Sequence, residues 1–176
     1  MQHSELVSAL AKPGQDIIAD MQPDKAHILH MAIGISGEVG ELVEAIMLND
    51  TVTQLEELGD LEFYFEGMCQ GMGFENVELS QTDLVGFDVK SMLIDLSITA
   101  SEILDTAKRM AIYNDDSQSM KMAENMDRYR IVISRVYHKL GIAREEARAK
   151  NIEKLSKRYA SMSYSNAQAK SRADKG

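Results

Sequence analysis

The chain of 176 residues has little of several residue types, and each shortage excludes a class of protein. Cys69 is its one cysteine, so no disulfide can form within the chain, and a reducing compartment, the cytoplasm, is expected. Two prolines and few clusters of β-branched residues disfavour a sheet-rich fold. No apolar run approaches the length of a membrane-spanning helix, and the N-terminal residues lack the layout of a signal peptide. We therefore expect no membrane partner.

Positive charge is also in short supply. The chain has 19 Lys and Arg residues against 28 Asp and Glu, which gives a net charge of −9. A nucleic-acid-binding surface needs a basic stripe, so no nucleic-acid partner is expected. An anionic substrate would gain nothing from the overall field of the protein, and local cations would have to attract it.

The residues that are abundant favour helix. Ala, Leu, Glu, Lys and Met are frequent, and the twelve methionines suit an adaptable helical core. Apolar residues recur at spacings of three and four, which predicts an all-α bundle of four to five main helices. We assign one domain to residues 1–160 and a polar tail to 161–176, with a helical turn at 167–172 and a loop at 74–87. The predicted helices cover residues 4–12, 24–48, 52–72, 88–113, 117–140 and 143–159, with Asp24, Thr51 and Ser117 as N-caps.

Two acidic pairs give the strongest chemical signal. Glu38 and Glu41 lie three residues apart on one predicted helix, and Glu57 and Asp60 do so on the next, so each pair shares a helix face. The short turn at Asn49 folds the two helices antiparallel, so positions equidistant from residue 49 lie at the same height. The spacing therefore predicts four carboxylates at one level on one side of the hairpin.

Such a cluster favours a divalent cation. Two unit charges about 4 Å apart repel by about 4 kcal/mol at an effective dielectric constant near 20, and oxygen ligands select Mg²⁺, Mn²⁺ or Ca²⁺. The alternative is a solvated acidic face, which is common on helices. Three mid-helix glycines near the carboxylates, Gly34, Gly37 and Gly40, favour the close approach of another backbone or a substrate.

At these residues the chain resembles the MazG-like all-α nucleoside triphosphate pyrophosphohydrolases, a superfamily that includes the dimeric dUTPases. The family signature, ExxE followed by ExxD, reads Glu38-x-x-Glu41 and Glu57-x-x-Asp60, with the flanks GEVGEL and EELGDL. The sequence HILHMAIG and the late stretch NIEKLSKRY are also similar to the family. The segment 169–175 is similar to the tails of phage-type and bacterial members. The resemblance covers residues 27–73 and 141–175.

The resemblance implies a Mg²⁺-dependent enzyme, with Mn²⁺ as a substitute, that hydrolyses a (d)NTP to (d)NMP and pyrophosphate in nucleotide-pool house-cleaning. It implies a homodimer or homotetramer and a nucleoside triphosphate substrate. The implied metal ligands are Glu38, Glu41, Glu57 and Asp60, with one of the first three orienting or deprotonating the attacking water. The implied substrate-binding residues are His30, Asn151, Lys154 and Arg158. A packed histidine and a solvated basic face are the alternatives for His30 and for the Lys154–Arg158 pair.

Several alternatives stay open. Many relatives carry lysines where this chain has Met47-Leu48-Asn49, and no Trp is available to contact a base, so base specificity is open and dUTPase-type specificity is an alternative. A catalytically silent helical interaction module and a metal-storage protein are rivals, although no Glu-x-x-His pair supports the latter. Residues 95–142 also echo residues 31–74, either as a degenerate repeat or as an unrelated second hairpin.

Overall fold

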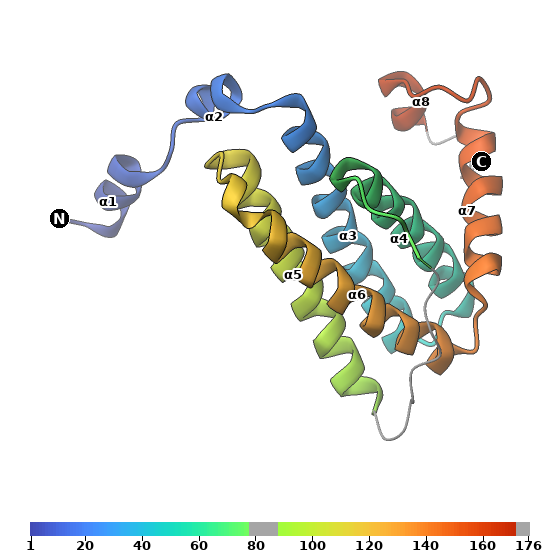
Figure 1. Ribbon diagram of the computed structural model, residues 1–176. Helices are drawn as coiled ribbons and strands as arrows, with labels where there is room; N and C mark the ends of the chain where they lie inside the picture. Colours follow the sequence, from blue (N-terminus) through green and yellow to red (C-terminus); the bar gives the residue numbers. More distant parts are fainter. Residues whose placement is uncertain (78–87, 172–176) are drawn as a thin grey trace.

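The computed structural model describes residues 1–77 and 88–171, and every regular element in these ranges is a helix (Figure 1). The predicted all-α fold is confirmed, and no helix of this part of the chain has the length and apolar content needed to cross a membrane. Part of the predicted loop (78–87) and the chain end (172–176) lie outside the described residues. The α-helices are α1 His3–Leu10, α2 Gly14–Asp20, α3 Pro23–Met47, α4 Thr51–Met72, α5 Val89–Ile112, α6 Ser119–Leu140, α7 Arg144–Arg158 and α8 Asn166–Ser171; a 3-10 helix, η1, covers Asp116–Gln118.

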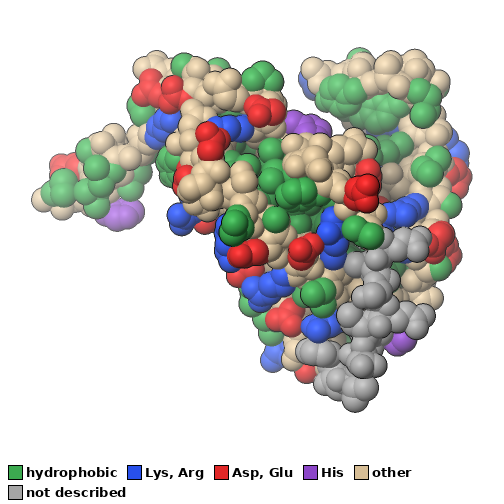
Figure 2. All heavy atoms as spheres, viewed as in Figure 1, with side chains coloured by type: hydrophobic (Ala, Val, Ile, Leu, Met, Phe, Trp, Pro, Cys, Tyr) green, Lys and Arg blue, Asp and Glu red, His purple; other side chains and the backbone are tan. Residues whose placement is uncertain are grey.

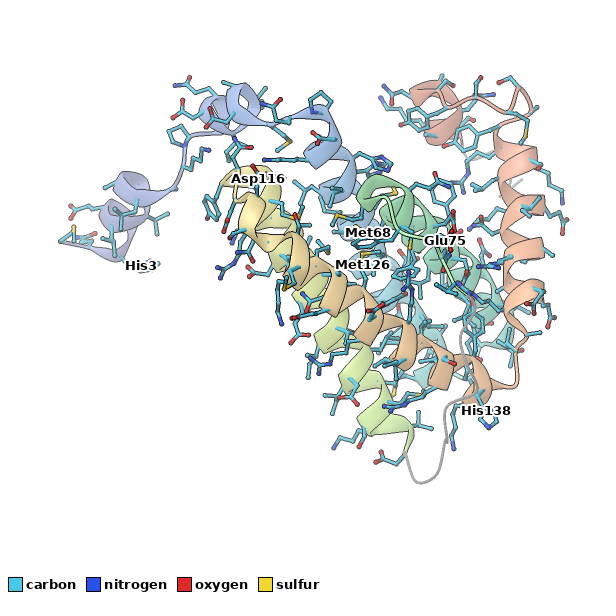
Figure 3. All side chains as sticks on the ribbon, viewed as in Figure 1. His3, Met68, Glu75, Asp116, Met126 and His138 are labelled. Carbon is cyan, nitrogen blue, oxygen red and sulfur yellow. The ribbon has the colours of Figure 1, made fainter. Side chains whose placement is uncertain are left out.

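The four long helices α3, α4, α5 and α6 surround one apolar core, and α7 packs along α4. Figure 3 marks Met68 on α4 and Met126 on α6, both of which lie fully inside this core. The predicted apolar stripes of α3 and α4 are buried there because their spacing of three and four puts them on one helix face. The bundle thus fixes α3 and α4 side by side as an antiparallel hairpin.

The two long hairpins share local features. The turn after α3 contains Asn49 with φ 55°, and the turn after α5 contains Asn114 with φ 52°. Asparagine tolerates this left-handed conformation better than most residues. Both hairpins end at a glycine in the same conformation, Gly73 with φ 70° and Gly141 with φ 68°. These matches are what a repeated hairpin would show.

The predicted caps at Thr51 and Ser117 are wrong in detail. Asp50, one residue earlier, accepts a hydrogen bond from the backbone nitrogen of Thr53 at 3.1 Å and caps α4. Asp115 accepts a hydrogen bond from the backbone nitrogen of Ser117 and begins η1, after which α6 starts. A carboxylate two or three residues before a free backbone N–H is a stronger acceptor than a hydroxyl, which explains both outcomes.

The N-terminal region also differs from the prediction. Helix α3 begins at Pro23, after the N-cap Gln22, because the fixed φ of proline suits the first turn of a helix; Asp24 is not its cap. Helix α2 has no counterpart among the predicted helices, which leave residues 13–23 unassigned. Proline ends one helix and is equally compatible with the start of the next.

Candidate active site

Three of the four predicted carboxylates meet between α3 and α4. Each of Glu38, Glu41 and Glu57 offers one oxygen, and these oxygens all lie within 4.8 Å of one another. Glu57 is 7% exposed, and Glu41 is open to solvent. A set of three carboxylates at this spacing is suited to a hard divalent cation.

The fourth carboxylate, that of Asp60, is held by α7 and is not part of this group of three. It accepts a hydrogen bond from Nδ2 of Asn151 at 2.6 Å and pairs with Nζ of Lys154. Nζ of Lys154 also lies 3.2 Å from Oε1 of Glu56. Burial alone would lower the pKa of Lys154, but the hydrogen bond to Asp60 and the charges of Asp60 and Glu56 outweigh it and raise that pKa. Lys154 therefore compensates acidic charge on α4.

The ionised forms of Glu38 and Glu57 are disfavoured in the folded chain. Burial, the hydrogen bond with Glu57 and the charges of Asp60, Glu57 and Glu41 together raise the pKa of Glu38 from its usual value near 4.5 to about 8, and burial is the largest cause. Burial also raises the pKa of Glu57, and the charge of Glu41 adds to it. The cluster thus retains a proton near neutral pH unless a cation replaces it.

Stability without metal should therefore fall as pH rises. Because the pKa of Glu38 is raised in the folded state, its contribution is fully present below about pH 4.5 and is lost as pH rises through about 8. In EDTA, the Tm of wild type should decrease between pH 5 and pH 8 more than that of Glu38→Gln, which cannot ionise. Thermal denaturation at four pH values checks this, with the exposed Glu44→Gln as control. Parallel curves for wild type and Glu38→Gln would contradict it.

A pocket of about 620 Å³ opens beside the carboxylates, a volume typical of small-molecule sites. It lies between α3, α4, α7 and the segment that follows α7. Its lining includes acidic groups as well as aromatic and apolar side chains. Its lining residues are His30, Met31, Glu38, Glu41, Glu56, Glu57, Asp60, Phe63, Tyr64, Asn151, Ile152, Leu155, Ser156, Arg158, Tyr159, Met162, Ser163, Tyr164 and Ala169.

The four residues expected to bind substrate divide into two kinds. His30, Asn151 and Arg158 line the pocket, whereas Lys154 is buried beneath it against the acids of α4. His30 is exposed, and its ring meets that of Tyr64 edge-on at 6.2 Å between centroids. His30 is thus at the pocket surface and is not packed in the core.

The glycines near the site have different environments. A Cβ at Gly34 would collide with the ring of Tyr64, so glycine here lets that ring lie against α3. A Cβ at Gly37 or Gly40 would meet nothing within 4 Å. Of the three glycines that the sequence singled out on α3, close approach within the chain thus accounts for Gly34 only.

Sequence reasoning missed a buried anchor on α4. Glu62 is 8% exposed and accepts hydrogen bonds from Nε of Arg144 at 2.7 Å, Nε of Arg148 at 2.9 Å and the hydroxyl of Tyr137 at 3.2 Å. These bonds fasten the start of α7 to α4 and so place Asn151 over Asp60. The spacing of Arg144 and Arg148, one helical turn apart, is the signal that could have indicated a shared partner.

Sequence reasoning also missed the aromatic residues of the pocket. Tyr159 and Tyr164 line it from the segment after α7, and Phe63 and Tyr64 line it from α4. They follow no common period, because they come from segments about a hundred residues apart. No motif within one helix could have joined them.

No family model, curated protein or solved structure matches this chain. The similarity to MazG-like enzymes therefore stands on the short motifs alone. What the chain does has to be argued from the chemistry of the carboxylates and of the pocket beside them.

Proposed function

We propose that this protein is a Mg²⁺-dependent nucleoside triphosphate pyrophosphohydrolase that converts a (d)NTP to (d)NMP and pyrophosphate. The observation that carries the proposal is the meeting of three carboxylates within 4.8 Å on the wall of a ligand-sized pocket. The resemblance of the same residues to the MazG-like enzymes supports it. The resemblance adds a homodimer or homotetramer and a house-cleaning role to the proposal, and the single cysteine adds a cytoplasmic location.

The residues present fit the implied cation. Glu38, Glu41 and Glu57 supply only oxygen donors, and their mutual repulsion is relieved when a divalent ion binds. Asp60 stands next to them and becomes a further ligand if Lys154 releases it. When bound, Mg²⁺ stabilises the negative charge that develops on the phosphates.

A carboxylate and an arginine of the pocket have further roles in this proposal. One carboxylate of the three orients or deprotonates the attacking water. Arg158, on the pocket wall, attracts the phosphates, for which the guanidinium group is well shaped. This local cation matters because the net charge of −9 repels an anionic substrate elsewhere.

A turnover assay tests the proposal. The purified chain is incubated with the common and the damaged (d)NTPs, with Mg²⁺ or with EDTA, and pyrophosphate and monophosphate are measured. We expect both products from at least one nucleotide, only with the cation. No turnover with any nucleotide would favour the silent interaction module, and tight Mg²⁺ binding without turnover would favour a metal-binding protein.

Mg²⁺ should also raise the thermal stability of the folded chain. The cation binds the carboxylate cluster only in the native state, so at a hundred times its Kd it adds about 2.7 kcal/mol. For a chain of this size that raises the Tm by roughly 5 °C or more. Differential scanning calorimetry in millimolar Mg²⁺ and in EDTA measures this. The same Tm in Mg²⁺ and in EDTA would argue against a preformed cation site.

A further inference from the structure

The chain after α7 turns back toward the bundle and forms one wall of the pocket. We call residues 159–171 the C-terminal strap. Its residues Tyr159, Met162, Ser163, Tyr164 and Ala169 line the pocket that also holds the carboxylates. Figure 1 shows the chain leaving the end of α7 and returning through α8 toward α4. In Figure 2, the same segment overhangs a hollow at the upper right of the molecule.

The strap has its own internal support. Met162 has φ 52°, a left-handed conformation that strains a non-glycine residue and that is often found at ligand clamps. Its backbone nitrogen donates to the carbonyl oxygen of Tyr159 at 2.8 Å, and the hydroxyl of Tyr164 donates to Oδ1 of Asn166 at 2.8 Å. Ser165 accepts a hydrogen bond from the backbone nitrogen of Gln168 at 3.2 Å at the start of α8. The strap is thus a folded structure that holds its side chains in place.

Aromatic rings face the pocket from two directions. On the strap, the rings of Tyr159 and Tyr164 lie 5.9 Å apart at 36°. On α4, Phe63 and Tyr64 meet edge-on at 5.4 Å. Tyr164 is 71% exposed and Phe63 48% exposed, so each leaves ring surface for a further flat group. The carboxylates that line the same pocket are suited to a cation and, through it, to phosphate.

We propose that the C-terminal strap is the base-recognition element of the site, with the nucleobase stacking on Tyr164 and Tyr159 while the phosphates reach the carboxylates. The proposal rests on the proposed nucleotide substrate. It assigns both ends of the ligand to one chain, because the strap and the carboxylates lie in the same protomer. It also assigns selectivity for an aromatic group to residues outside the acidic motifs.

A single substitution in the full chain tests this assignment. Stacking of one base on an aromatic side chain is worth about 1–3 kcal/mol, so Tyr164→Ala should raise the Kd for a nucleoside triphosphate by about 5- to 150-fold. The measurement is calorimetric titration of the common NTPs and dNTPs, with Ca²⁺ in place of Mg²⁺ to slow turnover. Inorganic pyrophosphate, titrated in the same buffer, should bind wild type and Tyr164→Ala equally, because it has no base.

Two control variants sharpen the test. Tyr164→Phe keeps the ring but loses the hydroxyl that bonds to Asn166, and it should restore most of the nucleotide affinity that Tyr164→Ala loses. Tyr113→Ala removes an exposed tyrosine at the end of α5, outside the pocket, and should change nothing.

The outcomes separate this assignment from the proposed hydrolysis. An unchanged nucleotide Kd in Tyr164→Ala, or an equal loss of nucleotide and pyrophosphate binding, overturns the role of the strap even if the enzyme is active. Binding that depends on Tyr164 without any hydrolysis upholds the strap and overturns the proposed reaction. A wild-type chain that binds no nucleotide overturns both.

Discussion

Glu57→Gln should lower nucleotide turnover by at least about a hundredfold, the effect expected when one key electrostatic group is removed from a reaction centre. Glu57 is the most enclosed of the three clustered carboxylates and hydrogen-bonds to Glu38. The amide keeps the size of the side chain but supplies no charge to a cation. Steady-state kinetics with the best substrate from the nucleotide panel measures the loss.

The same variant should not be destabilised without metal. Removing one of several mutually repelling charges leaves the apo protein as stable as wild type or slightly more so. The stabilisation by Mg²⁺ should disappear. Double amides of Glu57 with Glu38 or Glu41 should lose little more activity than the single variant, because groups that act through one cation are not additive.

Glu44 provides the matched control for this experiment. It lies exposed on the same helix as Glu38 but does not line the pocket, so Glu44→Gln should retain activity. Near-normal turnover in Glu57→Gln would indicate that Glu56, the neighbouring pocket-lining acid on α4, is the metal ligand instead. Full activity in the amide variants of Glu38, Glu41, Glu57 and Asp60 would reject the proposed enzyme.

Glu62→Gln should have the opposite profile, with a large loss of stability and a small effect on the reaction. Glu62 and Arg144 are 8% and 11% exposed, and the carboxylate also receives Arg148. Removing one partner of a buried ion pair costs about 3–5 kcal/mol. For a chain of this length the Tm should fall by roughly 10 °C. Thermal denaturation monitored by circular dichroism measures it.

The effect on activity distinguishes Glu62 from Glu57. Glu62 does not line the pocket, so the kcat of Glu62→Gln, measured well below its Tm, should stay within a few-fold of wild type. The KM is expected to rise modestly, because the bonds of Glu62 place α7 and with it Asn151. A Tm within one or two degrees of wild type would show that α7 is held in place without this pair.

The sequence alone determined the helical fold and the meeting of Glu38, Glu41 and Glu57. Both depend on local rules: the helical period sets which side chains share a face, and the short turn at Asn49 sets the height at which the two helices match. These relations hold over about twenty residues of chain. The prediction that the three carboxylates meet therefore used only positions within this hairpin.

The tertiary structure alone decided what surrounds that cluster. By helical period, Asp60 lies on the same side of the hairpin as Glu38, Glu41 and Glu57. Its oxygens are nevertheless bound by Asn151 and Lys154, which lie 91 and 94 positions further along the chain. Glu62 differs from an ordinary solvated acid because α7 packs Arg144 and Arg148 against it and α6 adds the hydroxyl of Tyr137. Tyr164 lines the pocket only because the chain reverses at Met162. Such contacts depend on which face of α4 receives α7, and the period of a single helix carries no information about that choice.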